Sequence, residues 1–171
     1  ILIVVENLPV PLDRRVWLEA TTLQQAGYEV SIISPMGRGW DAPYEIIDGV
    51  HIYRHSEPPE AHSGAVAYAR EYLHAMWFWF RLAAKVWKRR PFDVIQGCNP
   101  PDLIFLVAWP FKLSGTRFIF DHHDINPELY EAKFQKRGFF WKLMTWLERL
   151  TFRTADVTIS TNQSYRDIAI E

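Results

Sequence analysis

The sequence predicts an α/β fold, with a doubly wound, mostly parallel sheet and helices on both faces. Short apolar runs alternate with longer amphipathic stretches along all 171 residues. This alternation is typical of strand–helix–strand units, because parallel strands need a long crossover that a helix usually supplies. The composition is that of a globular protein, with 49% hydrophobic and 23% charged residues and a formal net charge of -1. That near-neutral charge gives no general attraction to nucleic acid, so we expect no nucleic-acid partner.

Each strand is expected at a short apolar run that ends in polar or small residues, and each helix at a longer stretch between two such runs. Asp13 and Gly27 suit the two ends of the first helix, and Asp48-Gly49 indicates a hairpin. The expected strands are Ile1–Val5, Tyr28–Ser34, two runs within Tyr44–His55, and the runs FDVIQG, RFIFDHH and ADVTIST. The expected helices are Asp13–Ala26, Gly64–Arg90, Asp102–Leu113, Phe139–Arg153, one starting near Pro127 and one from Gln163.

The ends of the chain indicate a piece of a longer protein. It opens inside an apolar strand without an initiator Met and stops inside a helix. The opening run is too short for a membrane span or a signal peptide. Cys98 is the single cysteine, so no intrachain disulfide is possible and a reducing compartment is favoured.

Four loops have the position at which doubly wound sheets bind ligands, beyond the carboxyl ends of the strands. They are ENLPVPLDRR, GCNPPD, DHHDINPE and STNQS. The first has no glycine, whereas a dinucleotide-binding loop needs G-x-G-x-x-G so that its backbone approaches a pyrophosphate. A P-loop is also absent, so a nicotinamide-dependent dehydrogenase is disfavoured.

Three blocks of sequence point to a known family. The first runs from ILIVV to SIISP and contains R-x-x-x-E-A-x-x-L-x-x-A-G-Y-E-V between Arg15 and Val30. The second is FDVIQGCNPPD through FDHHD, and the third is TADVTISTNQSY. Together they resemble the N-terminal domain of glycosyltransferase family 4 enzymes, including the D-V-I-x-x-H-x-P and H-D loops. The resemblance implies one Rossmann-like, acceptor-side domain over residues 1–171, truncated from a two-domain enzyme of the GT-B type.

The resemblance also implies a function. These enzymes move a sugar from a nucleotide-sugar donor to a hydroxyl of a glycan or lipid-linked acceptor, and they retain the anomeric configuration. The nucleotide-sugar is then a co-substrate, no cofactor or essential metal is expected, and the missing C-terminal domain holds most of the donor. We expect this domain alone to be inactive. The expected location is the cytoplasm. Any contact with the cell membrane is expected to be peripheral and at its inner face. The alternative is a non-catalytic glycan-binding or membrane-associated interaction module.

The sequence Asp121-His122-His123-Asp124 suggests a metal site at first sight. Side chains alternate along a strand, so Asp121 and His123 fall on one side and His122 and Asp124 on the other. Four adjacent residues therefore cannot all reach one ion, and a metal site is disfavoured. Aligned on H-D-x-x-P-E, the resemblance assigns His123 to the donor sugar or to transition-state charge, and His122 is expected to be structural.

Further substrate contacts are expected from the four loops. Arg14 and Arg15, with Asp13, suit phosphate or acceptor binding, although both arginines also suit first-turn helix positions that pair with carboxylates. Many members of the family have Gly-Gly in this loop, where this sequence has Pro9–Pro11. Asp124 or Asn126 is alternatively a helix cap. The remaining expected substrate-binding residues are Asn99, Asp124, Asn126, Glu128 and Asn162.

Two predicted helices combine aromatic and basic residues. In the stretch from Tyr68 to Arg90 the side expected to face the core carries Leu73, Met76, Phe80, Ala83 and Trp87. The opposite side carries Arg70, His74, Arg81, Lys85 and Lys88, flanked by Trp77 and Phe78. The second segment carries Phe139, Phe140 and Trp141 beside Lys136, Arg137 and Lys142. Packing into the core or against the missing domain, and docking on an anionic membrane surface, both remain open.

Overall fold

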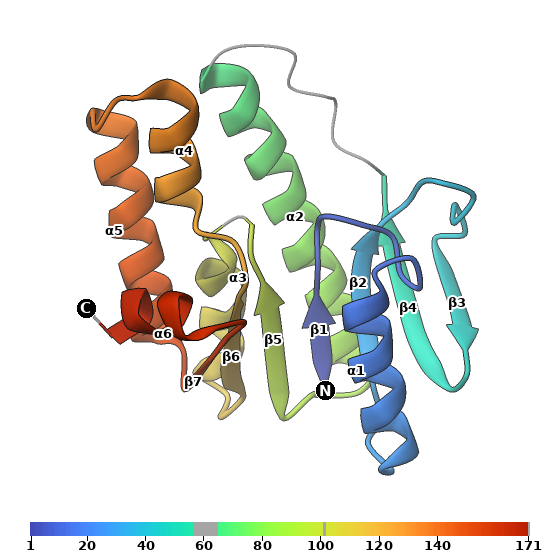
Figure 1. Ribbon diagram of the computed structural model, residues 1–171. Coiled ribbons are helices and arrows are strands. Elements are labelled where there is room, and N and C mark those ends of the chain that lie inside the picture. Colours follow the sequence, from blue (N-terminus) through green and yellow to red (C-terminus); the bar gives the residue numbers. More distant parts are fainter. Residues whose placement is uncertain (57–64, 101, 171) are drawn as a thin grey trace. The chain divides into compact units, whose positions relative to one another are not determined.

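The computed structural model describes residues 1–56, 65–100 and 102–170, and in that part of the chain six helices and seven strands are found (Figure 1). The chain divides into two compact units, Ile1–Ile95 and Gln96–Glu171. The division falls inside strand β5, Val94–Cys98. The prediction of a single domain over residues 1–171 stays a prediction, and each unit is described by itself below.

The first unit is built on four strands in the order β3-β4-β2-β1. The strands are β1 Leu2–Val4, β2 Ser31–Pro35, β3 Tyr44–Ile47 and β4 Val50–His55. β1 pairs with β2, and β2 with β4, in parallel, whereas β3 runs antiparallel to β4. Asp48 and Gly49 both have positive φ, 47° and 80°, which is the geometry of a two-residue type I′ hairpin. The predicted hairpin is confirmed.

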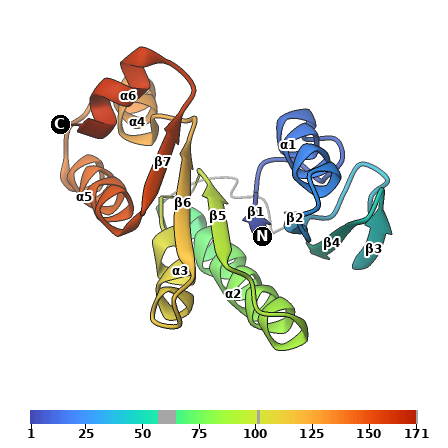
Figure 2. The ribbon, with the colours of Figure 1, turned by 90° about the horizontal axis from the view of Figure 1, so that it is seen from below.

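Two helices cover opposite faces of these strands (Figure 2). α1, Arg14–Gln25, begins after Asp13, whose Oδ1 accepts a hydrogen bond from the Val16 N–H at 3.1 Å. It ends before Gly27, where φ is +91° and the chain reverses in the left-handed conformation that suits glycine. Asp13 therefore caps the helix as predicted. The second helix is α2, Ala65–Arg89.

The buried side of α2 differs from the predicted one. Ala75, Trp79, Ala83 and Val86 face the sheet, and the two alanines let the helix lie close to it while Trp79 fills the space between them. Leu73 and Phe80 are 69% and 43% exposed, so their assignment to the core was wrong. Ala83 was assigned correctly, and Met76 and Trp87 are half-buried. The side chain of Arg70 lies outside the described residues.

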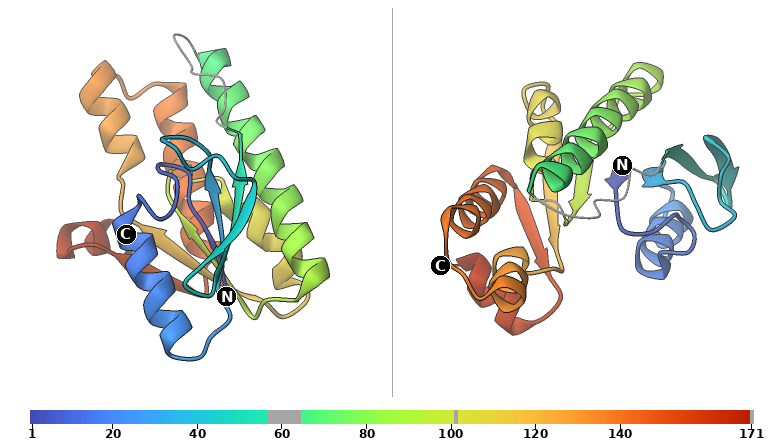
Figure 3. Two further views of the ribbon diagram at one scale, coloured as in Figure 1. Left: turned by 90° about the vertical axis from the view of Figure 1, so that its right-hand side faces the viewer. Right: turned by 90° about the horizontal axis from the view of Figure 1, so that it is seen from above.

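The second unit continues β5 with two further strands, in the order β5-β6-β7. β6, Arg117–His122, and β7, Val157–Ser160, are parallel, with His122 opposite Ser160. In Figures 2 and 3, α3 lies on one side of β6 while α4 and α6 lie on the other. The helices are α3 Ile104–Lys112, α4 Asn126–Phe134, α5 Phe139–Thr154 and α6 Gln163–Ile170. The predicted α/β class, with mostly parallel strands, is confirmed.

Gly97 allows α3 to approach β5 closely. A Cβ built at Gly97 would lie 2.9 Å from Cγ2 and 3.1 Å from Cβ of Ile104, and closer still to its Cγ1. Ile104 is fully buried, so it has no room to move aside. The absence of a side chain at residue 97 therefore fixes where α3 begins, and with it the turn from Asn99 to Asp102.

Candidate functional site

The loop that follows β6 is held by one side chain, the amide of Asn99. Its Oδ1 accepts hydrogen bonds from the backbone N–H groups of His123, at 2.9 Å, and Asp124, at 3.1 Å. Its Nδ2 donates to the Asp124 carbonyl at 2.5 Å and to Asp102 Oδ1 at 3.1 Å. Asn99 is 1% exposed, so these partners take the place of water. The predicted substrate contact of Asn99 stays a prediction; in the structure three of these four amide contacts hold the loop, and the fourth is to Asp102.

Asp102 lies beneath this loop and joins it to two helices. Its Oδ2 accepts a hydrogen bond from Asn126 Nδ2 at 2.8 Å, at the start of α4. Its backbone carbonyl accepts one from Thr151 Oγ1 on α5 at 2.7 Å. Asn126 is thereby bound to a carboxylate, and the N-cap of α4 is Ile125, without a side-chain cap. The predicted capping by Asp124 or Asn126 is wrong, because α4 begins at Asn126, after Ile125, and the Asn126 amide is bound to Asp102.

The pKa of the Asp102 carboxyl is raised to about 6, mainly by burial and also by the nearby Glu148 carboxylate. Hydrogen bonds from Asn126 and Asn99, together with His122, act in the opposite direction. Glu148 on α5 is itself buried and lies 3.4 Å from Nε2 of the fully buried His122. Sequence reasoning missed this cluster of Asp102, Glu148 and His122. Its signal in the sequence was two polar residues, Glu148 and Thr151, three positions apart in α5 and therefore on one face of that helix.

His123 and His122 point to different surroundings, as strand alternation predicted. His122 packs among the rings of Phe120, Phe152 and Tyr165. The His123 ring is 16% exposed, and its Nδ1 lies 3.3 Å from the Asp121 carbonyl and 3.9 Å from Asp121 Oδ1. His122 is thus a core residue. The imidazole of His123 is oriented through Nδ1, on the solvent-reaching side of the loop.

Asp121 is fixed from its other side. Cys98 Sγ, at the end of β5, donates to Asp121 Oδ2 at 3.4 Å, and both residues are buried. The Asn99 N–H donates to the Asp121 carbonyl at 3.2 Å. The carboxyl ends of β5 and β6 therefore form one rigid mount for the His123 loop. Cys98 is buried, as free cysteines usually are.

The remaining predicted site residues of the second unit have separate local roles. Glu128 lies in the first turn of α4, where a carboxylate is favoured by the helix dipole, and its Oε2 is buried without a hydrogen-bond partner among the described residues. Asn162 lies after β7, and its Oδ1 accepts from the Tyr165 N–H at 3.0 Å. That contact makes Asn162 an N-terminal cap of α6. The structure therefore brings together Asn99, His123, Asp124 and Asn126, with Glu128 one turn farther along.

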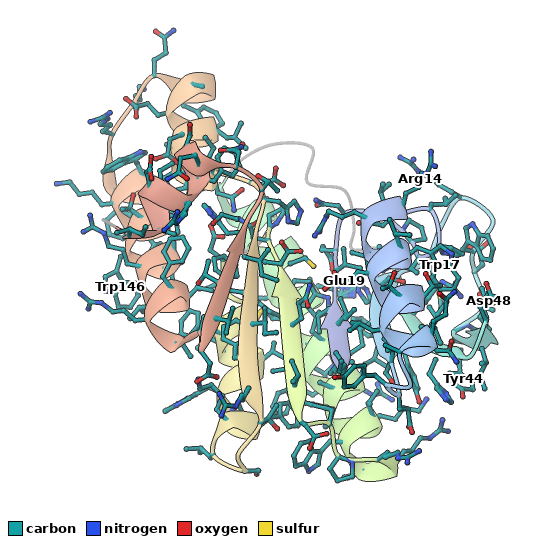
Figure 4. The ribbon with its side chains drawn as sticks, turned by 60° about the horizontal axis from the view of Figure 1, so that its bottom comes forward. Arg14, Trp17, Glu19, Tyr44, Asp48 and Trp146 are labelled. Carbon is teal, nitrogen blue, oxygen red and sulfur yellow. The ribbon has the colours of Figure 1, made fainter. Side chains whose placement is uncertain are left out.

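Asp13, Arg14 and Arg15 form their own group in the first unit. Arg14 and Arg15 are exposed in the first turn of α1, and Figure 4 shows Arg14 at the amino end of that helix. No acidic residue lies in that turn, and the two cations lie at the positive end of the helix dipole, beside the carboxylate of the Asp13 cap. The preceding loop is anchored at Val10. Its N–H donates to Ser34 Oγ at 3.4 Å and its carbonyl accepts from Arg54 Nη2 at 2.5 Å.

Two features of the first unit were not found from the sequence. Glu6, after β1, lies 3.3 Å from Nε2 of the buried His55 at the end of β4. A cavity of about 350 Å³ lies at the amino ends of the strands, lined among others by Tyr44, Tyr53 and Arg89. None of the predicted site residues lines it. The predicted carboxyl-end loops and this cavity therefore belong to opposite ends of the strands.

Two general features were searched for in the described residues. No group of three or more His, Cys, Asp or Glu side chains is arranged there to hold a metal ion. No described helix combines the length and the apolar character needed to cross a bilayer.

Comparison with known families gives a match to the glycosyl transferase 4-like domain over residues 12–171. The chain belongs to this family. The matched segment contains both the Asn99 turn and the His123 loop, and the resemblance noted in the sequence is confirmed. No curated protein was found to match the sequence.

Among solved structures, the glycosyl transferase 4-like domain is similar to sucrose-phosphate synthase from Thermosynechococcus elongatus. The TM-score is 0.62, at 12% sequence identity. The similarity covers 92% of this chain and 41% of that structure. It shows the fold, that of a GT-B glycosyltransferase, and this chain spans about two fifths of the length of that protein.

Proposed function

We propose that this domain is the acceptor-side half of a retaining glycosyltransferase. The reaction is transfer of a sugar from a nucleotide-sugar to a hydroxyl of a glycan or lipid-linked acceptor. The observation that supports it is the His123 loop. In this glycosyl transferase 4-like domain, Asn99 holds His123 at the carboxyl end of β6. It does so by accepting hydrogen bonds from the backbone N–H groups of His123 and Asp124. This is the edge at which α/β sheets bind their ligands.

The proposed role of His123 is to stabilise the donor as its diphosphate departs. Charge that develops on a leaving group is stabilised best by a donor that is already in place, since no reorganisation is then needed. The Asp121 contacts at Nδ1 orient the imidazole for this purpose. Glu128 supports a sugar contact, because its buried Oε2 has no partner among the described residues and a sugar hydroxyl would supply one.

The residues at the amino end of α1 support anion binding in the same reaction. Arg14 and Arg15 extend from the positive end of the helix, where a diphosphate or a charged acceptor would be favoured. Asp13 contributes indirectly, since it caps the helix and fixes its first turn. We propose no metal for this step, since the cationic side chains and the helix end supply positive charge.

Two surfaces support peripheral membrane contact. On α2, Leu73, Trp77 and Phe80 are exposed beside Arg81 and Lys85. On and just before α5, exposed Phe139, Phe140 and Trp146 accompany exposed Lys136, Arg137 and Lys142. Aromatic residues enter the interface while basic residues meet anionic headgroups. α5 buries Glu148 and Thr151 while exposing Phe139, Phe140 and Trp146, which leaves these three rings available to a partner outside the domain. We therefore place the enzyme at the inner face of the cell membrane.

The test of the enzyme is a donor screen on the full-length protein, with released nucleoside diphosphate as the readout. We expect turnover of at least one sugar nucleotide. His123→Ala should then lower kcat/KM by about a hundredfold, while the matched control His51→Ala, on β4, should not. Turnover unchanged by His123→Ala would remove the assignment. Wild-type protein that releases no nucleotide from any donor, yet binds glycan, would favour a non-catalytic glycan-binding module.

Membrane contact is tested separately by co-sedimentation with phosphatidylcholine vesicles, with and without phosphatidylglycerol. We expect binding that needs the anionic lipid, weakens with salt and is reduced by Trp77→Ser or Trp146→Ser. Leu113→Ser, which changes another exposed apolar residue, is the control. Vesicle binding that depends neither on the anionic lipid nor on these substitutions would contradict the proposal.

A further inference from the structure

Asp102 is a buried acid that does not reach the exposed surface of the loop, yet it touches the groups that shape it. Its two carboxylate oxygens accept one amide each, from Asn99 at 3.1 Å and from Asn126 at 2.8 Å. Its carbonyl is bound by Thr151 of α5. Three elements of the second unit, the β5–α3 turn, α4 and α5, therefore meet at one residue.

We propose that Asp102 is a positioning residue of the glycosyl transfer: its carboxylate sets the orientation of the Asn99 amide, and through it the backbone of His123 and Asp124. This inference rests on the proposed function for its catalytic consequence. The structural part, control of the loop by Asp102, stands on the hydrogen bonds alone.

The argument depends on which atoms accept and which donate. A carboxylate accepts hydrogen bonds only, so it selects the Asn99 rotamer in which Nδ2 faces Asp102. Oδ1 then faces the N–H groups of His123 and Asp124, which need an acceptor. The flipped amide would place Nδ2 against those two donors and Oδ1 against the carboxylate. Asp102 thus acts together with the two N–H groups and the Asp124 carbonyl against the rotamer that would release the loop.

The same logic applies to protonation. A protonated Asp102 has one oxygen that carries a proton and donates, so this oxygen is a weaker acceptor for the Asn99 or Asn126 amide that points at it. With its pKa raised to about 6, this change falls in the range in which enzymes are assayed. The other titratable groups that act on Asp102 are Glu148 from α5 and His122 from β6. The loop is therefore held firmly above about pH 6 and more loosely below it.

Asp102→Asn is the informative variant, because an amide at this position keeps the size of the side chain and has one accepting atom where the carboxylate has two. It imitates the protonated acid at every pH. In the full-length enzyme we expect kcat/KM to fall about tenfold at about pH 8. The ratio of wild-type to variant should approach one at about pH 5, where the wild-type acid is protonated. The matched control is Asp167→Asn, the same chemical change at an exposed position on α6. It should leave kcat/KM and its pH profile unchanged.

A second readout does not require activity. Hydrogen exchange of the His123 and Asp124 amides should become about fivefold or more faster in Asp102→Asn at about pH 8. The Phe118 amide, which donates to Asp156 Oδ2 at 2.7 Å, serves as the internal control. Unchanged exchange at His123 and Asp124 would overturn the inference. Faster exchange in a protein that turns over no donor would uphold the loop control while the proposed function fails. Faster exchange with a wild-type pH profile in an active variant would overturn the catalytic consequence.

Discussion

Replacing Gly97 by alanine should destabilise the second unit through one collision. The added Cβ would meet Cγ1, Cγ2 and Cβ of Ile104, with separations of 2.9 Å and 3.1 Å to the last two and a shorter one to the first. Gly97 is not among the residues with positive φ, so alanine meets no backbone penalty there. The loss of stability is therefore steric in origin, and relieving the collision requires the Ile104 side chain to move.

The loss in the free energy of unfolding depends on how far Ile104 and α3 can shift. Real Cβ atoms essentially never approach other atoms this closely, and Ile104 is fully buried at the start of α3. Overpacking of this kind costs about 1–3 kcal/mol when the core yields only by small shifts. Because a shift of α3 also moves Asp102, we expect about 2–3 kcal/mol for Gly97→Ala, with faster amide exchange at His123.

The assay is urea unfolding of wild-type, Gly97→Ala, Ile104→Ala and the double variant. Ile104→Ala alone should cost about 2–5 kcal/mol because it leaves a cavity. In the double variant the new methyl group occupies part of that cavity, so the two costs should not add, with a coupling of about 1–2 kcal/mol. Gly97→Ala with wild-type stability, or strictly additive costs, would refute the close approach of α3 to β5.

The remaining predictions concern caps and pH. Asp13→Ala should lower the free energy of unfolding by about 1 kcal/mol, since Val16 loses its capping acceptor. Asn162→Ala should cost a similar amount in α6; a large change in KM at wild-type stability would instead assign Asn162 to substrate. Because the folded pKa of Asp102, about 6, lies above its ordinary value of 3.8, Asp102 favours the folded state below about pH 4, and this contribution is lost as pH rises through about 6. Relative to Asp102→Asn, wild-type stability should therefore fall by up to about 3 kcal/mol across that range, and parallel pH curves would contradict the raised pKa.

Much of the fold was predictable because local signals agreed. Asp48-Gly49 specified the hairpin, and Asp13 and Gly27 specified the ends of α1, since the chemistry of these turns is local. α2 was harder, because apolar residues lie around most of its circumference. Periodicity selected Leu73 and Phe80, whereas the sheet packs against the side that has small residues at 75 and 83.

The candidate site was predictable in position and only partly in mechanism. The loops and the opposite faces of His122 and His123 follow from strand geometry. The role of Asn99 in holding the loop was not predictable, because the loop residues that it binds, His123 and Asp124, lie more than twenty positions away along the chain. Asp102 was missed for the same reason, since its burial depends on α5, which lies far along the chain.

The hydrogen bonds from Asn99 to the loop have a consequence for how the sequence of this domain can evolve. Both of its acceptor contacts, and one of its donor contacts, are to main-chain atoms of residues 123 and 124. Every amino acid except proline supplies the same atoms. The hydrogen bonds that hold the loop therefore do not depend on which side chain is at residue 123. One substitution at residue 123 would change the chemical groups offered to a ligand while leaving the loop in place. The side chain at residue 123 and the architecture of the loop can therefore diverge independently in such a domain.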